Sequence, residues 1–267
     1  MDLNTVQNYR FARTREDLTL APGERIMGGG TWLFSEPQVD TSGLVDLSAM
    51  GWPALEYPEG GLRIGATCTI AELSELPERP GWNAHPLFFQ CAGALLASFK
   101  IWNVATVGGN VCRSFAAAAM VSLCVALDGS ALIWTPDGSE RRTPVAQLVT
   151  GNGENSLAPG EVLRAIDIPD HALRAATGFR KIALAALGRS AAVLTGRVDE
   201  DRQAVFTITA ATLRPTVLRY PEPPDAAALE RDVVAAEGFY TDPLGVADWR
   251  RHVSAVLLEE IRQELVA

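Results

Sequence analysis

The sequence of 267 residues is short of basic residues and has no long apolar run. Its 23 lysines and arginines are outnumbered by 32 aspartates and glutamates, which gives a formal charge of −9. Proteins that bind the phosphate backbone of nucleic acids cluster basic residues on one face, so this balance argues against such a partner. The longest nearly apolar run, residues 116–127, is shorter than the roughly 20 residues that span a bilayer. The first residues show no apolar signal segment, so we expect a cytoplasmic protein without a membrane span.

Cysteine and histidine are also scarce, which bears on metal sites. The four cysteines form no Cys-x-x-Cys pair, and the three histidines lie far apart in the sequence. These spacings fit no zinc, haem or iron–sulfur site, so we expect no metal on this chain. No Ser–His–Asp constellation is visible either, and no catalytic residue is predicted. We interpret four residues as buried free thiols: Cys68, Cys91, Cys112 and Cys124.

The length suggests one or two domains, and the character of the sequence changes after Pro159 and Gly160. Strand-like runs then follow one another with mostly short connections, which is typical of an antiparallel sheet. These runs cover residues 162–168, 179–184, 191–198 and 204–212. We predict an α+β fold, with a first domain over residues 1–165 and a second domain, a sheet with helices, over residues 166–267.

Several stretches predict helices with a buried face. Thr69 and Glu72 have the spacing of a capping box, so a helix is expected to begin there. Residues 116–127 predict a helix that is packed on both sides. A third helix is predicted from the spacing of Phe88, Cys91, Ala92, Leu95, Leu96 and Phe99. Two helices are expected to close the chain. The last has an apolar stripe of Trp249, Val253, Val256, Leu257, Ile261 and Leu265, with charged residues such as Arg250 largely off it.

Three consecutive glycines, Gly28, Gly29 and Gly30, follow a short apolar run and precede Thr31. Glycines allow the backbone to turn tightly and to point successive N–H groups outward, which forms a concavity for phosphate or pyrophosphate oxygens. The segment is neither a Walker A motif nor a Gly-x-Gly-x-x-Gly motif. Taken alone, it is also compatible with an ordinary glycine-rich surface turn.

A second glycine pair, Gly108 and Gly109, also follows an apolar run. Thr106 and Asn110 beside it offer neutral hydrogen-bonding groups, and a buried helix is predicted shortly afterwards. Two such loops in one small domain could grip the two ends of a diphosphate. The alternative is a pair of unrelated turns.

Together these segments resemble a known family, the FAD-binding medium subunits of molybdenum hydroxylases, which include xanthine dehydrogenase and aerobic carbon monoxide dehydrogenase. The first loop resembles the family's Ala-Gly-Gly-Thr-Asp-Leu stretch. Residues 103–110 are similar to its Arg-Asn-Val-Ala-Thr-Ile-Gly-Gly-Asn segment. Further similar stretches lie at residues 62–73 and 242–257, so the resemblance covers nearly the whole chain.

The resemblance implies a bipartite FAD-binding domain of the vanillyl-alcohol-oxidase (PCMH) type, followed by a small domain with a three-stranded antiparallel sheet and helices. It also implies an oxidoreductase subunit that carries FAD and is active within a heterotrimeric complex. A large partner subunit would hold molybdopterin, and a small one would hold two [2Fe–2S] clusters. Electrons would pass from the nearer cluster through the flavin to NAD+, dioxygen or another acceptor.

The resemblance further implies which residues contact FAD. The first glycine segment would hold the pyrophosphate, and the second would contact the diphosphate and ribityl region from the other side. Leu163 would contact the ring system and Lys181 would lie near the flavin, although a core leucine and a solvated strand lysine are the alternatives. The predicted cofactor-binding residues are Met27, Gly28, Gly29, Gly30, Thr31, Trp32, Leu33, Thr106, Gly108, Gly109, Asn110, Leu163 and Lys181.

Three positions depart from the family pattern. Trp32 replaces a small polar or acidic residue, Trp102 replaces an arginine, and Ala119 stands nearest to an aspartate that helps to orient the cofactor's sugar. Arg113 is new in that stretch and could reach a phosphate in place of the missing contact. These departures leave two alternatives open: a flavin-free assembly subunit, and a stand-alone flavin oxidase or dehydrogenase with its own small substrate.

Overall fold

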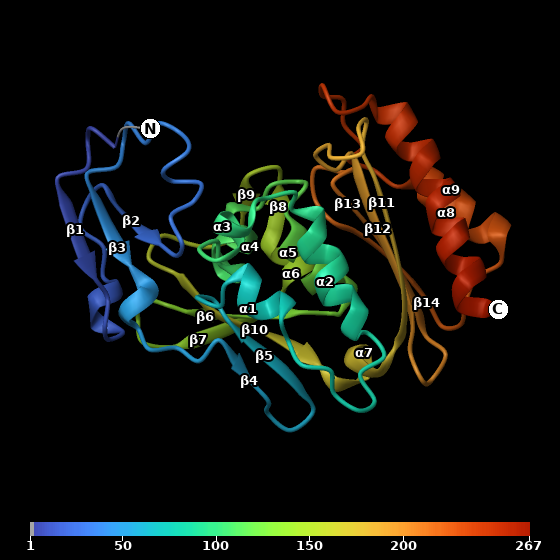
Figure 1. Ribbon diagram of the computed structural model, residues 1–267, viewed down its shortest axis with the longest axis horizontal. Helices are drawn as coiled ribbons and strands as arrows, with labels where there is room; N and C mark the ends of the chain where they lie inside the picture. The colour runs from blue at the N-terminus through green and yellow to red at the C-terminus, as the bar shows by residue number, and fades with distance from the viewer. Residues whose placement is uncertain (1–2) are drawn as a thin grey trace.

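The computed structural model describes residues 3–267, and Figure 1 shows its elements arranged in a row from the N-terminal sheet to the C-terminal helices. The first sheet is parallel and has the strand order β1-β3-β2. Its strands are β1 (Asn8–Phe11), β2 (Glu24–Met27) and β3 (Gly43–Asp46). Short 3-10 turns, η1 (Glu16–Leu18) and η2 (Leu47–Ala49), bury Leu18 and Leu47 in its core. The sheet directs the end of β2, and the glycines after it, toward the middle of the molecule.

A second sheet forms the centre of the molecule and has the order β4-β5-β10-β6-β7. Its strands are β4 (Leu55–Glu56), β5 (Gly61–Gly65), β6 (Ser130–Trp134), β7 (Glu140–Pro144) and β10 (Val162–Pro169). The run at 162–168 was expected in the sheet that follows Pro159 and Gly160, but as β10 it lies between β5 and β6 of this earlier sheet. The prediction was wrong because the residues of a strand do not reveal which distant segments it pairs with.

Helices and short turns connect these strands and cover the central sheet. In chain order they are α1 (Ile70–Ser74), α2 (His85–Ala94), α3 (Phe99–Trp102), α4 (Val107–Arg113), α5 (Ala119–Ala126), α6 (Val145–Leu148), the ribbon of β8 (Val149–Gly151) and β9 (Glu154–Asn155), and α7 (Asp170–Arg174). The capping box predicted at Thr69 is present at the start of α1. All eight residues of α5 are buried, which confirms the helix expected within 116–127. The helix predicted over 88–99 is only partly correct, because α2 ends at Ala94 and Phe99 is 73% exposed.

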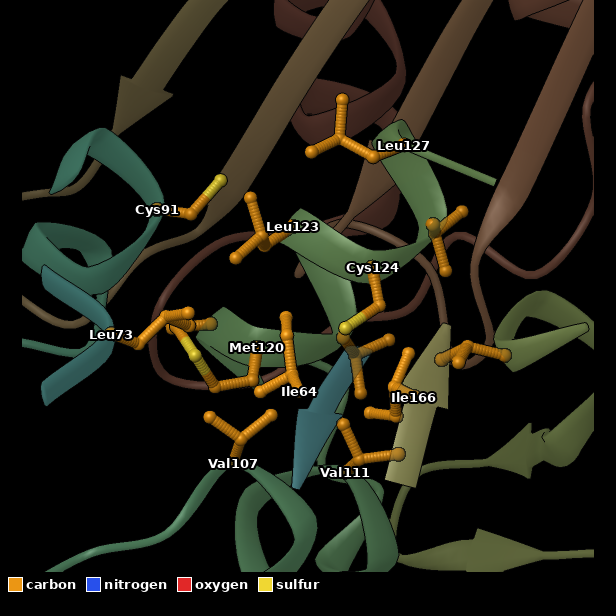
Figure 2. Close-up of a cluster of buried hydrophobic side chains, with 14 of the residues drawn as sticks. Ile64, Leu73, Cys91, Val107, Val111, Met120, Leu123, Cys124, Leu127 and Ile166 are labelled. Atoms are coloured by element: carbon orange, nitrogen blue, oxygen red, sulfur yellow. The ribbon is translucent and has the colours of Figure 1, made fainter. Parts of the chain in front are cut away.

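The main hydrophobic core lies where α4 and α5 pack on β5 and β10. Figure 2 shows Val107 and Val111 of α4 pointing toward Ile64 of β5 and Ile166 of β10, with side chains of α5 above them. Val107 and Val111 are one helical turn apart, so one face of α4 is fixed in the core. Gly109 and Asn110, which lie between the two valines in the sequence, consequently face away from the core.

The third sheet is antiparallel and has four strands in sequence order. They are β11 (Ala176–Ile182), β12 (Ala192–Val198), β13 (Ala204–Thr209) and β14 (Thr216–Tyr220). The strand β14 is additional to the three that were expected, because Pro215 and the nearby prolines mask it in the sequence. As Figure 1 shows, α8 (Ala226–Ala235) and α9 (Ala247–Val266) cover its outer face, while α2 and α5 contact the inner face.

The two closing helices are present as predicted, and the predicted stripe of α9 is partly correct, because Ile261 is buried and Leu257 and Leu265 pack against the same core. The residues buried on α9 are Arg250, Ser254, Leu258 and Ile261, whereas Val256 is 60% exposed. Arg250 is buried because its guanidinium donates hydrogen bonds to the carbonyl oxygens of Ala191 and Ala210 and pairs with Asp242. Polar burial of this kind, satisfied by backbone acceptors, is invisible to a hydrophobicity pattern.

Among residues 3–267, none of the helices combines the length and the apolar character needed to cross a membrane.

Candidate functional site

A cavity of about 670 Å³ opens between the first sheet, α4 and the end of the central sheet at which β10 begins. Its lining comes from both glycine segments, from β2, from the start of β10 and from residues near α3. The volume lies in the range of small-molecule and cofactor sites.

The first glycine segment forms a turn that touches the second segment directly. Gly30 has φ +70°, a left-handed conformation that favours glycine, and its carbonyl oxygen accepts a hydrogen bond of 2.9 Å from the Phe34 amide. A Cβ atom at Gly29 would overlap the carbonyl oxygen of Val104. A Cβ atom at Gly28 would lie 2.6 Å from Oγ1 of Thr106. The close approach of the two segments therefore requires glycine at both positions.

The second glycine segment begins α4 and is held in place by hydrogen bonds. Oγ1 of Thr106 accepts a hydrogen bond of 3.1 Å from the amide of Gly109 and caps the helix. The amide of Gly108 donates to the carbonyl oxygen of Ala66, and a Cβ atom there would lie 2.6 Å from Ala66 Cβ. Oδ1 of Asn110 accepts a hydrogen bond of 2.9 Å from the amide of Met120, which ties α4 to the first turn of α5.

Apolar residues form a separate part of the cavity wall. Leu163 of β10 is 3% exposed and lines the cavity next to Val162, while Leu95 and Ile101 contribute from the segment before α4. A wall of this kind suits a flat, apolar ring, whereas the glycine segments present polar backbone. The cavity thus has an apolar part and a polar part, as a dinucleotide with a ring system and a diphosphate requires.

The charges of the wall are unevenly compensated. Glu24 lines the cavity, but hydrogen bonds from the Arg10 guanidinium, with help from the Ala21 amide, hold its pKa at about 2. Arg25 and Arg113 also line the cavity, and neither forms an ion pair within the part of the chain that the structure describes. The wall therefore presents positive charge together with outward-facing glycine backbone, which favours an anionic group.

Cys112 lines the same cavity as a neutral thiol. Burial raises its pKa to about 12, so the thiolate that would make it a nucleophile is not formed at neutral pH. The other three cysteines are buried and free, as expected from the sequence.

Most of the predicted cofactor-binding residues line this one cavity. The lining includes Gly28, Gly29, Gly30, Thr31, Trp32, Leu33, Thr106, Gly108, Gly109, Asn110 and Leu163. Met27 lies beneath the turn and Lys181 lies on β11, and neither is part of the lining. Their contact with a cofactor remains a prediction.

The three positions that depart from the family pattern lie in different surroundings. Trp32 lines the cavity and makes an edge-to-face contact with Phe115, the ring centroids being 6.3 Å apart. Trp102 packs edge-to-face against Phe89 outside the cavity lining. Ala119 is buried at the start of α5 and also lies outside the lining.

Sequence reasoning missed part of the wall. Phe115 and the apolar residues Leu20, Ile26, Leu47, Leu95, Ile101 and Leu157 line the cavity without any motif that marks them. Their contribution depends on tertiary packing alone. Arg113 is the exception, since it departs from the family pattern and was for that reason predicted to reach a phosphate.

The residues present fit FAD. Two glycine turns leave room that a Cβ atom would fill, a cap positions backbone amides, and apolar side chains form a separate wall. These are the groups that hold a flavin dinucleotide by its diphosphate and its ring.

Comparisons with known solved structures support the same fold. The chain is similar to chains of the quinoline 2-oxidoreductase of Pseudomonas putida 86 (TM-score 0.82, 19% identity, 99% of this chain and 98% of the other). It is also similar to chains of the CO dehydrogenase of Oligotropha carboxidovorans (TM-score 0.84, 20% identity, 99% of each chain). At these identities the likeness concerns the fold.

Comparisons of sequence point to named relatives. A xanthine dehydrogenase FAD-binding subunit of Escherichia coli O157:H7 is 33% identical over 113 residues, 42% of this chain and 37% of the relative. Subunit alpha of the 6-hydroxypseudooxynicotine dehydrogenase complex of Paenarthrobacter nicotinovorans is 27% identical over 161 residues, 56% of this chain and 48% of the relative. The matched region thus spans less than half of each of these relatives.

The family model for the FAD binding domain in molybdopterin dehydrogenase matches residues 8–171, a range that contains both glycine segments and Leu163. It covers more than half of the chain. The chain therefore belongs to the family of FAD-binding domains found in molybdopterin dehydrogenases.

Proposed function

We propose that this chain is the FAD-carrying electron-transfer subunit of a molybdenum hydroxylase complex of the xanthine dehydrogenase family. The observation that carries the proposal is the meeting of two glycine segments across one cavity, where Gly28 and Gly29 approach Thr106 and Val104 too closely for any side chain. The family assignment and the names of the relatives support it.

In this proposal each part of the cavity has its own task. The backbone amides of residues 28–31 bind the diphosphate, and residues 106–110, held in position by the Thr106 cap of α4, contact it from the other side. Leu163 and the apolar wall around it cover the ring and exclude water. When bound, FAD supplies redox chemistry that exchanges electrons one or two at a time.

The partners follow from the same proposal. A large subunit would hold molybdopterin and a small subunit would hold [2Fe–2S] clusters, a proposal supported by the molybdopterin dehydrogenase family assignment and by the relative that is named as a subunit of a dehydrogenase complex. The chain would hold FAD while electrons pass from those clusters to NAD+, dioxygen or another acceptor.

We also propose the division into an FAD-binding domain over residues 1–165 and a C-terminal domain over residues 166–267. The third sheet and the helices α8 and α9 share a hydrophobic core of their own, which includes Phe206, Leu229 and Ile261. That separate core supports a division of the chain, although β10, which crosses the boundary, belongs wholly to the central sheet.

The test is the visible absorption spectrum of the purified full chain, followed by identification of the cofactor released on denaturation. We expect a flavin spectrum and close to one FAD per chain. A folded, colourless chain that also fails to bind added FAD would favour the flavin-free assembly subunit. Oxidation of a small substrate by the isolated chain, without partner subunits, would favour the stand-alone enzyme.

A further inference from the structure

Arg113 is clamped between two aromatic rings on the cavity wall and has no carboxylate partner within residues 3–267. Its guanidinium carbon lies 4.0 Å from the ring centroid of Trp32 and 3.9 Å from that of Phe115. Its one hydrogen bond is long, 3.4 Å from Nη1 to the carbonyl oxygen of Gly153. Nε is buried and has no hydrogen-bond partner among the described residues. Buried donors are normally paired, so this group lacks an acceptor.

The surroundings of Arg113 disfavour its charge in the absence of an anion. Burial lowers the pKa of Arg113, and the like charge of Arg25 lowers it further, against a smaller opposing effect of Glu36. The carboxylate on the wall, that of Glu24, is already engaged by Arg10. Two cations, Arg25 and Arg113, therefore line one cavity without an ion-pair partner among residues 3–267.

We propose that Arg113 is a direct ligand of the diphosphate of the bound dinucleotide, held ready by Trp32 and Phe115. The inference deepens the proposed function and rests on it, because it takes FAD to be the ligand. The two negative charges of a diphosphate match the two cations on the wall. The free donor of Arg113 gains an acceptor in the same contact.

The two rings that hold Arg113 explain why a tryptophan stands at position 32. A carboxylate at position 32 would pair with Arg113 and repel a phosphate, whereas the indole of Trp32 stacks on the guanidinium and leaves its charge available. Stacking also fixes the plane of the guanidinium before the ligand arrives, so little side-chain freedom is lost on binding. Trp32 is therefore a positioning residue for Arg113.

The test measures the Kd of FAD for the full chain by fluorescence titration at low and high salt. Arg113→Met keeps an unbranched side chain between the rings but removes the charge, and Arg113→Lys restores a charge without the planar fork. Arg79→Met is the matched control, because Arg79 is also held between two aromatic rings, 3.4 Å from that of Tyr57 and 5.5 Å from that of Trp82, and does not line the cavity. Near-ultraviolet circular dichroism of each variant checks the fold.

We expect Arg113→Met to weaken FAD binding by about 10- to 100-fold and to flatten its salt dependence. Arg113→Lys should bind more tightly than Arg113→Met and retain the salt dependence, while Arg79→Met should bind as the wild type does. The inference is overturned if Arg113→Met binds within about threefold of the wild type. It is also overturned if the lysine variant is as weak as the methionine variant, because Arg113 would then only fill space. Failure of the wild type itself to bind FAD would overturn the proposed function and this inference together.

Discussion

Gly29 lies at the point where the two walls of the cavity come closest, and its lack of a side chain is a geometric requirement. The carbonyl oxygen of Val104 occupies the place that a Cβ atom at residue 29 would take. The oxygen belongs to the backbone, and a Cβ atom is fixed by the backbone of residue 29, so neither can move aside without shifting its segment. A single added methyl group is thus enough to push the two glycine segments apart.

We expect Gly29→Ala to weaken FAD binding by at least about tenfold, because the first glycine turn must move away from the second. The measurement is the FAD content of the purified variant together with a titration of added FAD. Gly93→Ala is the control: a Cβ atom there, on the exposed side of α2, meets nothing within 4 Å. That variant should keep its FAD and gain about 0.5–1 kcal/mol in free energy of unfolding. Equal FAD content in both variants would show that residue 29 is not part of the FAD-binding site.

Among the elements, α9 shows how a helix can be correctly predicted while only part of its predicted apolar stripe is buried. The apolar residues alone place both Val256 and Ile261 on the buried side. In the structure Ile261 is fully buried against Gly178 and Gly196 of the third sheet, and Val256 points to solvent. The two glycines leave a depression in the sheet that the isoleucine side chain fills.

This orientation gives a paired prediction. Ile261→Ala should lower the free energy of unfolding by about 2–4 kcal/mol, because it leaves a cavity against the sheet. Val256→Ala should change it by less than about 0.5 kcal/mol, because its side chain is already in water. Chemical denaturation of the two variants under identical conditions is the measurement. Similar losses for both would mean that the helix buries the stripe predicted from the sequence.

At the scale of the whole molecule, one carboxylate joins the end of α5 to the third sheet. Asp128, directly after α5, pairs with Arg197 of β12 and Arg219 of β14. Arg197 is itself buried and donates a hydrogen bond of 2.8 Å to the carbonyl oxygen of Ala126. The junction therefore links the two proposed domains through a buried arginine, a mostly buried carboxylate and the half-exposed Arg219.

The junction makes stability depend on pH in a defined direction. Burial raises the pKa of Asp128, but the hydrogen bonds and charges of Arg219 and Arg197 outweigh it and hold the pKa at about 2, below the ordinary 3.8. Because the folded-state pKa is the lower one, the stabilisation is complete above about pH 4 and is lost as the pH falls toward about 2.

We expect Asp128→Asn to lower the free energy of unfolding by about 2 kcal/mol at neutral pH. The difference from the wild type should shrink as the pH falls and should vanish near about pH 2. Denaturation curves across the acid range are the measurement, with Asp248→Asn, at a side chain that is 83% exposed, as a control without effect. A difference that stays constant with pH would contradict the assigned ion pairs.

The features that the sequence predicts well are those with a local signal. The capping box at Thr69, the nearly apolar α5 and the two glycine segments each depend on residues within a few positions of one another. Both glycine segments were expected to serve one ligand, and the structure brings them to one cavity.

The features that the sequence did not reveal depend on contacts between distant segments. The neighbours of β10 in its sheet lie far back in the chain, and the burial of Arg250 depends on carbonyl oxygens of Ala191 and Ala210. The clamp around Arg113 likewise needs Trp32, which belongs to the other wall. Periodicity and spacing carry no information about such pairings.

The central position of β10 also has a consequence for how the protein is made. Residues 28–31 leave the ribosome early and residues 106–110 much later, but the sheet that supports the cavity lacks its middle strand until residue 169 has been synthesised. A nascent chain consequently exposes its apolar segments for most of translation before it can capture a nucleotide. We therefore expect nucleotide binding to begin only after β10 has emerged. We expect a product truncated before β10 to carry both glycine segments, to fail to bind flavin and to be degraded by proteases.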